Sequence, residues 1–249
     1  MVDIKKLDVY RGDDLVGQLL DEPELKFIYA QSWLYGQGKP ISPTLNFSEK
    51  EFSGLPVESY FENLLPEAGI RELLKLKYQV TSTFGLLGVI GGDTASDLTI
   101  LPEGERPNKP EYQAINWDEV ALSFKSSSGP VQVAQQEKGM RISLAGAQKK
   151  LGVVLDAQDN ISLPLGSAPS TYIVKPDIAG IEGVWASAVN ETFVMKLANR
   201  LGLDVAPVMY QPTAKSCIIK RYDRVIDNAD DIQKFIKWTF ASLIKNPQR

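Results

Sequence analysis

The residues of this 249-residue chain whose types and spacing best suit chemistry lie between Arg141 and Lys150, in the sequence RISLAGAQKK. The pattern predicts a short strand that enters a turn of small residues, with Lys149 and Lys150 directly behind it. Small residues let backbone N–H groups approach an anion closely, and lysines add positive charge. The segment therefore suits a polyphosphate, while an ordinary β-turn beside lysines is the simpler interpretation of these residues taken alone.

Further along the chain lie residues that could complete a phosphate site. Lys175 ends an expected strand over 170–175 in the sequence YIVKPD, and Glu191 follows near the start of an expected helix over 187–202. A strand lysine that contacts phosphates and a helix glutamate that orients it form the upper half of a kinase site. Taken alone, Lys175 and Glu191 are more simply explained as ordinary surface charges.

Four segments together resemble one protein family, the HipA-type toxin kinases. ISLAGAQKK (142–150), YIVKPD (172–177), NETFVMKLANRLGLDVA (190–206) and KRYDR (220–224) are similar to that family's amino-terminal lobe. Earlier positions are similar to the family's amino-terminal subdomain: Val9-Tyr10, Gly17, Trp33-Leu34, FENLLPE (61–67), Arg71 and LPEGE (101–105). The resemblance spans about residues 5–224 in the family's order.

The resemblance implies an α+β fold in two parts. An amino-terminal mixed α/β subdomain is expected over 1–105 and a linker over 106–112. A partial protein-kinase-like N-lobe with an antiparallel sheet, followed by one C-terminal helix, is expected over 113–249. The charged stretch 103–110, which holds two prolines and no apolar periodicity, independently indicates a boundary there.

The resemblance also implies roles for individual residues. The nucleotide-binding positions are Ala145, Gly146, Ala147, Gln148, Lys149, Lys150, Lys175, Tyr222 and Asp223. Glu191 would orient the lysine, Tyr222 would pack near adenine and Asp223 near ribose. Ser143 matches an autophosphorylation site, where a phosphate would expel the loop from the pocket; a plain strand serine is the other interpretation.

No catalytic residue and no metal ligand is expected within these 249 residues. The chain has no histidine, and its one cysteine, Cys217, is expected to be a buried thiol. No glycine follows Gly202, so the DFG-like metal loop that phosphoryl transfer needs cannot be present. The family uses ATP and Mg²⁺; for this chain we expect weak or absent binding of both and impaired or absent transfer, which leaves its status as an enzyme open.

By resemblance, the partners are a small helix-turn-helix antitoxin (HipB-like) and a protein substrate of the translation machinery, usually an aminoacyl-tRNA synthetase such as glutamyl-tRNA synthetase. The alternative is a non-catalytic antitoxin-binding or regulatory module. A net charge of -4 argues against direct nucleic-acid binding. No apolar run reaches the roughly 18 residues that cross a membrane, and the start of the chain lacks a signal-peptide pattern. We therefore expect a cytoplasmic protein.

Apolar periodicity predicts the elements that position these residues. Strands are expected over 4–10, 15–20, 27–34, 151–155, 170–175 and 217–222, and helices over 56–64, 67–77, 187–202 and 230–245. In the helix over 187–202, apolar residues recur at every fourth position from Val189 to Leu201, and Gly202 stops the helix. Asn190 either caps this helix or lies in its apolar stripe.

Overall fold

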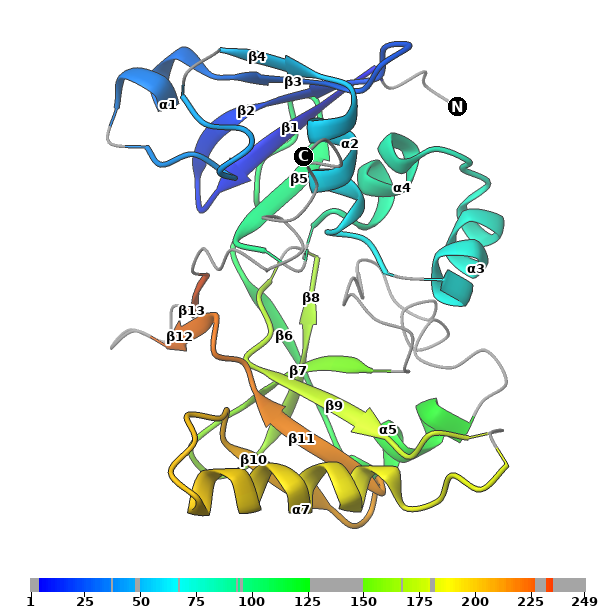
Figure 1. Ribbon diagram of the computed structural model, residues 1–249. Coiled ribbons are helices and arrows are strands. Elements are labelled where there is room, and N and C mark those ends of the chain that lie inside the picture. The colour runs from blue at the N-terminus through cyan, green and yellow to red at the C-terminus, as the bar shows by residue number, and fades with distance from the viewer. Residues whose placement is uncertain are drawn as a thin grey trace, which may run out of the picture. The chain divides into compact units, whose positions relative to one another are not determined.

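The computed structural model describes residues 5–125, 150–226 and 232–234, apart from residues 37, 48, 49, 67, 93, 95, 167, 180 and 181. These residues form two compact units, of which the first runs to Asn108 and the second begins at Lys109. Each unit is built on its own antiparallel sheet (Figure 1). Among the described residues, no helix has the length and apolar character needed to cross a bilayer.

The first unit contains a five-stranded antiparallel sheet in the order β4-β3-β2-β1-β5. Its strands are β1 (Lys6–Arg11), β2 (Asp14–Leu20), β3 (Lys26–Tyr29), β4 (Glu51–Ser53) and β5 (Leu98–Pro102). The strands predicted over 4–10 and 15–20 are confirmed as β1 and β2, and Arg11 pairs with Asp14 across the two-residue loop that joins them. Gly12 in this loop has a φ of 58°, which glycine adopts without a steric cost.

Four helices complete the first unit: α1 (Gln31–Tyr35), α2 (Leu55–Glu62), α3 (Ala68–Tyr78) and α4 (Thr83–Ile90). The core joins sheet and helices through aromatic packing, since the rings of Phe27 in β3 and Phe61 in α2 are 5.6 Å apart and both side chains are fully buried. The bounds of α2 and α3 confirm the helices predicted over 56–64 and 67–77.

The strand predicted over 27–34 is wrong in its second half, because β3 ends at Tyr29 and α1 follows. The chain leaves the sheet where the Tyr29 hydroxyl binds two backbone groups of the next loop: it accepts from Ile41 N and donates to the Leu45 carbonyl. Trp33 lies outside the sheet, with the Arg11 guanidinium 5.1 Å from its ring centre. Local β-propensity was overridden by these tertiary contacts.

The second unit contains a six-stranded antiparallel sheet in the order β10-β11-β9-β7-β8-β6. Its strands are β6 (Glu111–Ile115), β7 (Leu151–Leu155), β8 (Ile161–Leu165), β9 (Tyr172–Pro176), β10 (Val208–Gln211) and β11 (Ser216–Lys220). Among the described residues, the helices α5 (Trp117–Lys125) and α7 (Ser187–Arg200) accompany it, and β12 (Arg224–Ile226) pairs with β13 (Ile232–Lys234) in a separate sheet. The predicted α+β fold with an antiparallel second sheet is confirmed.

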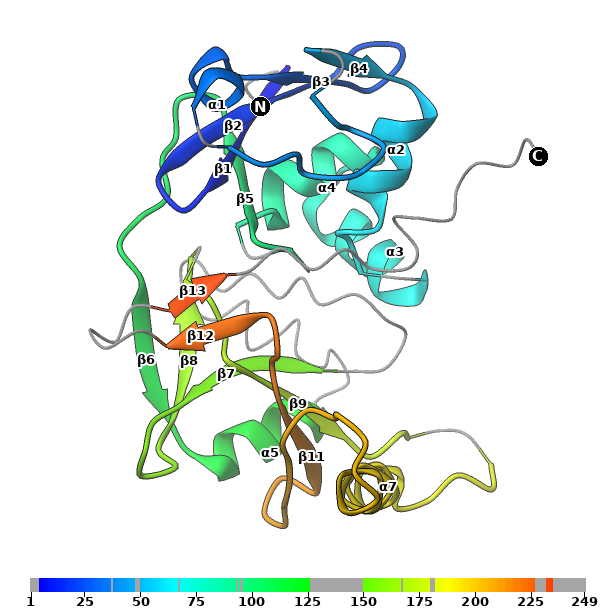
Figure 2. The same cartoon turned by 60° about the vertical axis from the view of Figure 1, so that its left-hand side comes forward.

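The two helices of this unit lie on opposite faces of its sheet (Figure 2). Val174 of β9 and Ile218 of β11 are register partners and share a buried cluster with Val120 of α5. Side chains alternate along a strand, so the next pair in register, Lys175 and Cys217, points to the other face, where α7 lies. The register thus brings Lys175 to the helix that carries Glu191.

The helix predicted over 187–202 is confirmed as α7, but its apolar stripe is not a core face. Ala188 and Thr192 are the buried residues of α7, whereas the predicted stripe is exposed, with Phe193 at 64%. Asn190 is exposed too, and it does not cap the helix, because the N-cap position is Ala186. Gly202 ends the helix as predicted, with a φ of 82°.

The predicted helix over 230–245 is wrong in its first part. Ile232–Lys234 forms strand β13, which is held by pairing with β12. Residues 235–245 lie outside the described residues.

Candidate nucleotide site

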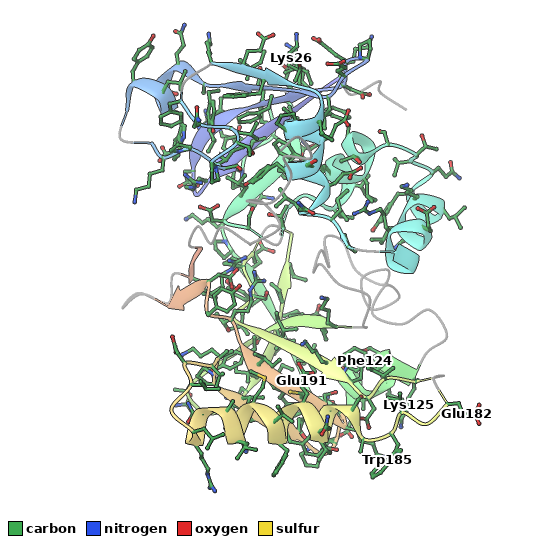
Figure 3. All side chains as sticks on the ribbon, viewed as in Figure 1. Lys26, Phe124, Lys125, Glu182, Trp185 and Glu191 are labelled. Carbon is green, nitrogen blue, oxygen red and sulfur yellow. The ribbon has the colours of Figure 1, made fainter. Side chains whose placement is uncertain are left out.

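Lys175 and Glu191 form an ion pair between β9 and α7. Lys175 Nζ lies 2.6 Å from Glu191 Oε1, and the two side chains are 23% and 30% exposed. This short distance is typical of a charge-assisted hydrogen bond. In Figure 3 Glu191 lies on the side of α7 that faces the strands. The ammonium group is thus held in one direction while it still reaches solvent, as a phosphate-binding lysine requires.

Lys150 directly precedes strand β7, which is the neighbour of β9 in the sheet. Leu151 of β7 is the register partner of Val174 in β9, and the same antiparallel register extended by one residue places Lys150 opposite Lys175. Directly opposite residues of an antiparallel pair project to the same face. Extending the printed register would thus set Lys150 beside Lys175, and the phosphate-binding role of both lysines stays a prediction.

Asp177 ties the strand of Lys175 to the helix of Glu191. The left-handed N-cap residue of α7, Ala186, makes no side-chain cap. Asp177 Oδ1 instead accepts a hydrogen bond from the backbone N of Ala188 at 2.9 Å, and Ser187 Oγ accepts from Ile178 N at 2.7 Å. Sequence reasoning missed this role, although a carboxylate two residues after the strand lysine was the available signal.

A small buried layer lies beneath the ion pair. Cys217 of β11 is fully buried, which confirms the predicted structural thiol. Burial raises the pKa of Cys217 above its ordinary value, and a hydrogen bond with Thr192 of α7 partly opposes this. Cys217 therefore packs the helix onto the sheet as a neutral side chain.

Tyr222 and Asp223 occupy the link between β11 and β12. The Tyr222 side chain is 63% exposed, whereas the Asp223 side chain is only 13% exposed. Arg221 donates from Nε and Nη2 to both carboxylate oxygens of Asp223, and Arg224 Nη1 lies 2.7 Å from Oδ2. Burial raises the pKa of Asp223, but the hydrogen bonds and charges of the two arginines lower it more, so the net pKa lies below its ordinary value.

The remaining predicted site residues fall outside the described part of the chain. They are Ser143, Ala145, Gly146, Ala147, Gln148 and Lys149. Their roles, and the nucleotide contacts expected of Tyr222 and Asp223, stay predictions.

The described residues fit a nucleotide's phosphates better than a metal ion. Within the described ranges, no group of three or more acidic, histidine or cysteine side chains could hold a metal. The two carboxylates next to Lys175 are engaged, Glu191 with the lysine and Asp177 with the start of α7. The weak or absent Mg²⁺ binding that we expect from the sequence stays a prediction.

An antiparallel sheet whose lysine is paired to a helix glutamate is the arrangement of a protein-kinase N-lobe. Comparison with family models identifies residues 7–101 as a HipA N-terminal domain and residues 142–249 as a HipA-like C-terminal domain. The chain belongs to the HipA family, as the resemblance in its motifs predicted.

Similar proteins support this assignment. The Sinorhizobium fredii protein Y4mE, named as a presumed kinase, is 34% identical over 98% of this chain and 60% of its own length. The Shewanella oneidensis serine/threonine-protein kinase toxin HipA is 29% identical over 88% of this chain and 50% of its own length.

The fold is also similar to a solved structure. A chain in the complex of Shewanella oneidensis HipA, HipB and its operator DNA matches with a TM-score of 0.73 and 25% identity, over 92% of this chain and 53% of that chain. The chain thus spans between half and three fifths of the length of these relatives.

Proposed function

We propose that this chain is the nucleotide-gripping part of a HipA-like serine/threonine protein kinase toxin. One observation carries the proposal: the 2.6 Å ion pair of Lys175 and Glu191. Lys150 directly precedes β7, and extending the register of β7 and β9 by one residue would place a second ammonium group on the same face of the sheet. Two ammonium groups on one face of the sheet suit the closely spaced negative charges of a triphosphate. Glu191 contributes by orienting Lys175, so that less freedom is lost when ATP binds.

Nucleotide binding can be measured directly by calorimetric titration with ATP. We expect Lys175→Ala to raise the dissociation constant at least about tenfold, equivalent to ~1.4 kcal/mol. Lys196→Ala is the matched control, because Lys196 is an exposed lysine of α7. Equal affinities for the two variants would contradict the proposed site.

The substrate and the rate form a second part of the proposal. The substrate is a translation protein of the aminoacyl-tRNA synthetase class, which implies action in the cytoplasm. These 249 residues by themselves transfer phosphate slowly or not at all, because they include no histidine and no glycine after Gly202 with which to build the family's catalytic and metal loops. The test uses γ-labelled ATP, Mg²⁺ and glutamyl-tRNA synthetase, with an active full-length relative as positive control; robust labelling by this chain would refute impaired activity.

A second function, a non-catalytic antitoxin-binding module, is favoured by a separate observation. The solved structure that this chain matches over 92% of its length is a complex that includes HipB and operator DNA. The proposed partner is a small helix-turn-helix antitoxin of the HipB type. Co-purification of the two proteins supports this function, and no association at micromolar concentration would count against it. Repeating the experiment with operator DNA tests whether the chain itself avoids nucleic acid, as its charge of -4 predicts.

A further inference from the structure

The four residues Ser170, Arg221, Asp223 and Arg224 form a buried cluster that we call the guanidinium clamp. Counted over backbone and side chain together, Arg221, Asp223 and Arg224 are at most 9% exposed, and Ser170 is fully buried. Arg221 grips the carboxylate of Asp223 with two hydrogen bonds, of 3.0 and 2.8 Å. Arg224 Nη1 binds the same carboxylate at 2.7 Å and the Asp223 carbonyl oxygen at 3.0 Å. Both carboxylate oxygens are therefore engaged inside the protein.

The clamp joins the link after β11 to the start of β9. Arg221 Nη1 donates to Ser170 Oγ at 2.9 Å, and the backbone N of Arg221 donates to the Thr171 carbonyl at 2.8 Å. Strand β9 begins at the next residue, Tyr172, and carries Lys175. One guanidinium group thus connects the strand of the phosphate-binding lysine with the backbone on either side of Tyr222.

Tyr222 is the exposed residue between two buried members of the clamp. Its neighbours Arg221 and Asp223 are 5% and 9% exposed, while Tyr222 itself is 63% exposed. Because the backbone is held on both sides, the Cα–Cβ bond of Tyr222 leaves the link in a fixed direction, which restricts the ring to the few positions that its rotamers allow. A preorganised ring binds a flat ligand at a smaller entropic cost than a mobile one.

We propose that Asp223 is a positioning residue and not a ligand of the ribose: through the guanidinium clamp it holds Tyr222 and Lys175 at the spacing that one nucleotide requires. The inference rests on the proposed nucleotide-binding function. It differs from the role near ribose that the family resemblance implied for Asp223. A largely buried carboxylate that already binds two arginines is poorly placed to accept hydrogen bonds from ribose hydroxyl groups.

Three ligands distinguish a positioning role of Asp223 from direct contact with the ribose. They are ATP, 2′,3′-dideoxy-ATP and inorganic tripolyphosphate, each titrated by calorimetry into the whole chain. For Asp223→Asn we expect ATP to bind about tenfold more weakly and tripolyphosphate to change less than about twofold. The ratio of the ATP and dideoxy-ATP affinities should be the same in the variant and in the unaltered chain. Asp204→Asn, which alters an exposed carboxylate, should change none of these values.

Further variants guard against a simple loss of folding. Ser170→Ala keeps every charge of the clamp and should weaken ATP binding about twofold to threefold, again without an effect on tripolyphosphate. Adding Asp223→Asn to Tyr222→Ala should weaken ATP binding no further than Tyr222→Ala alone, because the clamp acts through the ring.

Several outcomes would overturn the proposed positioning role of the guanidinium clamp. One is a change in the ratio of the ATP and dideoxy-ATP affinities in Asp223→Asn. Another is an equal loss of ATP affinity and tripolyphosphate affinity in that variant. The third is an ATP affinity that the clamp variants leave unchanged. If binding depends on Lys175 while the clamp variants leave ATP affinity unchanged, the proposed function stands and only this inference is wrong. If the unaltered chain binds neither ATP nor tripolyphosphate, both are overturned.

Discussion

Lys175 and Glu191 form a partly exposed ion pair, and such pairs add little to folding stability. Solvent screens the two charges, and both side chains lose rotational freedom when they pair. The value of this pair lies in the direction that it gives to the Lys175 ammonium group. Its 2.6 Å contact joins a strand and a helix, so both elements together determine the orientation of the Lys175 ammonium group.

Glu191→Gln tests this division between stability and orientation. We expect the free energy of unfolding to change by less than about 1 kcal/mol, because the pair is partly exposed. ATP affinity should fall by a larger factor than this change in stability accounts for. Urea unfolding and calorimetric titration of the same preparation measure both quantities, with the exposed Glu182→Gln as control. A large loss of stability with unchanged ATP affinity would contradict the assignment.

Asp223 makes the free energy of unfolding of the second unit depend on pH in the acidic range. Its pKa is lowered in the folded state, since the two arginines outweigh the effect of burial. A carboxylate with a lowered folded pKa stabilises the protein above its unfolded pKa of about 3.9, and this stabilisation is lost as the pH falls through the folded pKa. We expect the free energy of unfolding to decrease below about pH 4, with a shallower decrease in Asp223→Asn than in Asp204→Asn. Identical acid profiles for the two variants would show that the clamp carries no charge-dependent stability.

At the scale of elements, the start of α7 depends on a carboxylate from outside the helix. The residue at the N-cap position is alanine in a left-handed conformation, which leaves the first backbone N–H groups without a local side-chain acceptor. Asp177 meets this need from the loop that follows β9. The same contact joins the loop after the strand of Lys175 to the start of the helix that carries Glu191.

Asp177→Ala should destabilise the protein by about 1 kcal/mol, the usual cost of losing a helix cap. It should also weaken ATP binding, because α7 loses a tie to β9. Chemical denaturation and nucleotide titration measure the two effects, and Asp204→Ala removes a comparable exposed carboxylate as a control. Normal ATP affinity in Asp177→Ala would mean that the helix is positioned by its packing alone.

At the scale of the whole molecule, each unit has its own core. In the first unit Phe27 and Phe61 pack between sheet and helix, and in the second Val174 and Ile218 pack with Val120. Separate cores allow one unit to open while the other keeps its structure.

Phe61→Ala tests this independence. Removing a fully buried aromatic ring should destabilise the first unit by about 3–5 kcal/mol. Hydrogen exchange followed by mass spectrometry should show faster exchange in β1, β3 and α4, with unchanged rates in β9 and α7. Faster exchange throughout both units would show that the chain unfolds as a single cooperative structure.

Much of the fold could be predicted because local patterns and tertiary contacts agree. The alternation in β7 and β9, the turn at Gly12 and the stop at Gly202 all survive in the structure. The predictions failed where tertiary contacts prevailed over local pattern: strand β3 ends at Tyr29, whose hydroxyl binds the next loop, and β13 pairs with β12. Likewise, the apolar stripe of α7 is exposed, because the small residues Ala188 and Thr192 pack on the sheet.

By itself, the sequence determined the strand with Lys175 and the helix with Glu191, since these follow from residue types at local spacing. The resemblance of its motifs gave the family and the expected partnership of the two residues. Only the tertiary structure decided that β7, the strand after Lys150, pairs with the strand of Lys175, that Asp177 caps α7 and that two arginines engage Asp223. Strand register and side-chain contacts between segments far apart in the chain set these relations, and neither leaves a local pattern in the sequence.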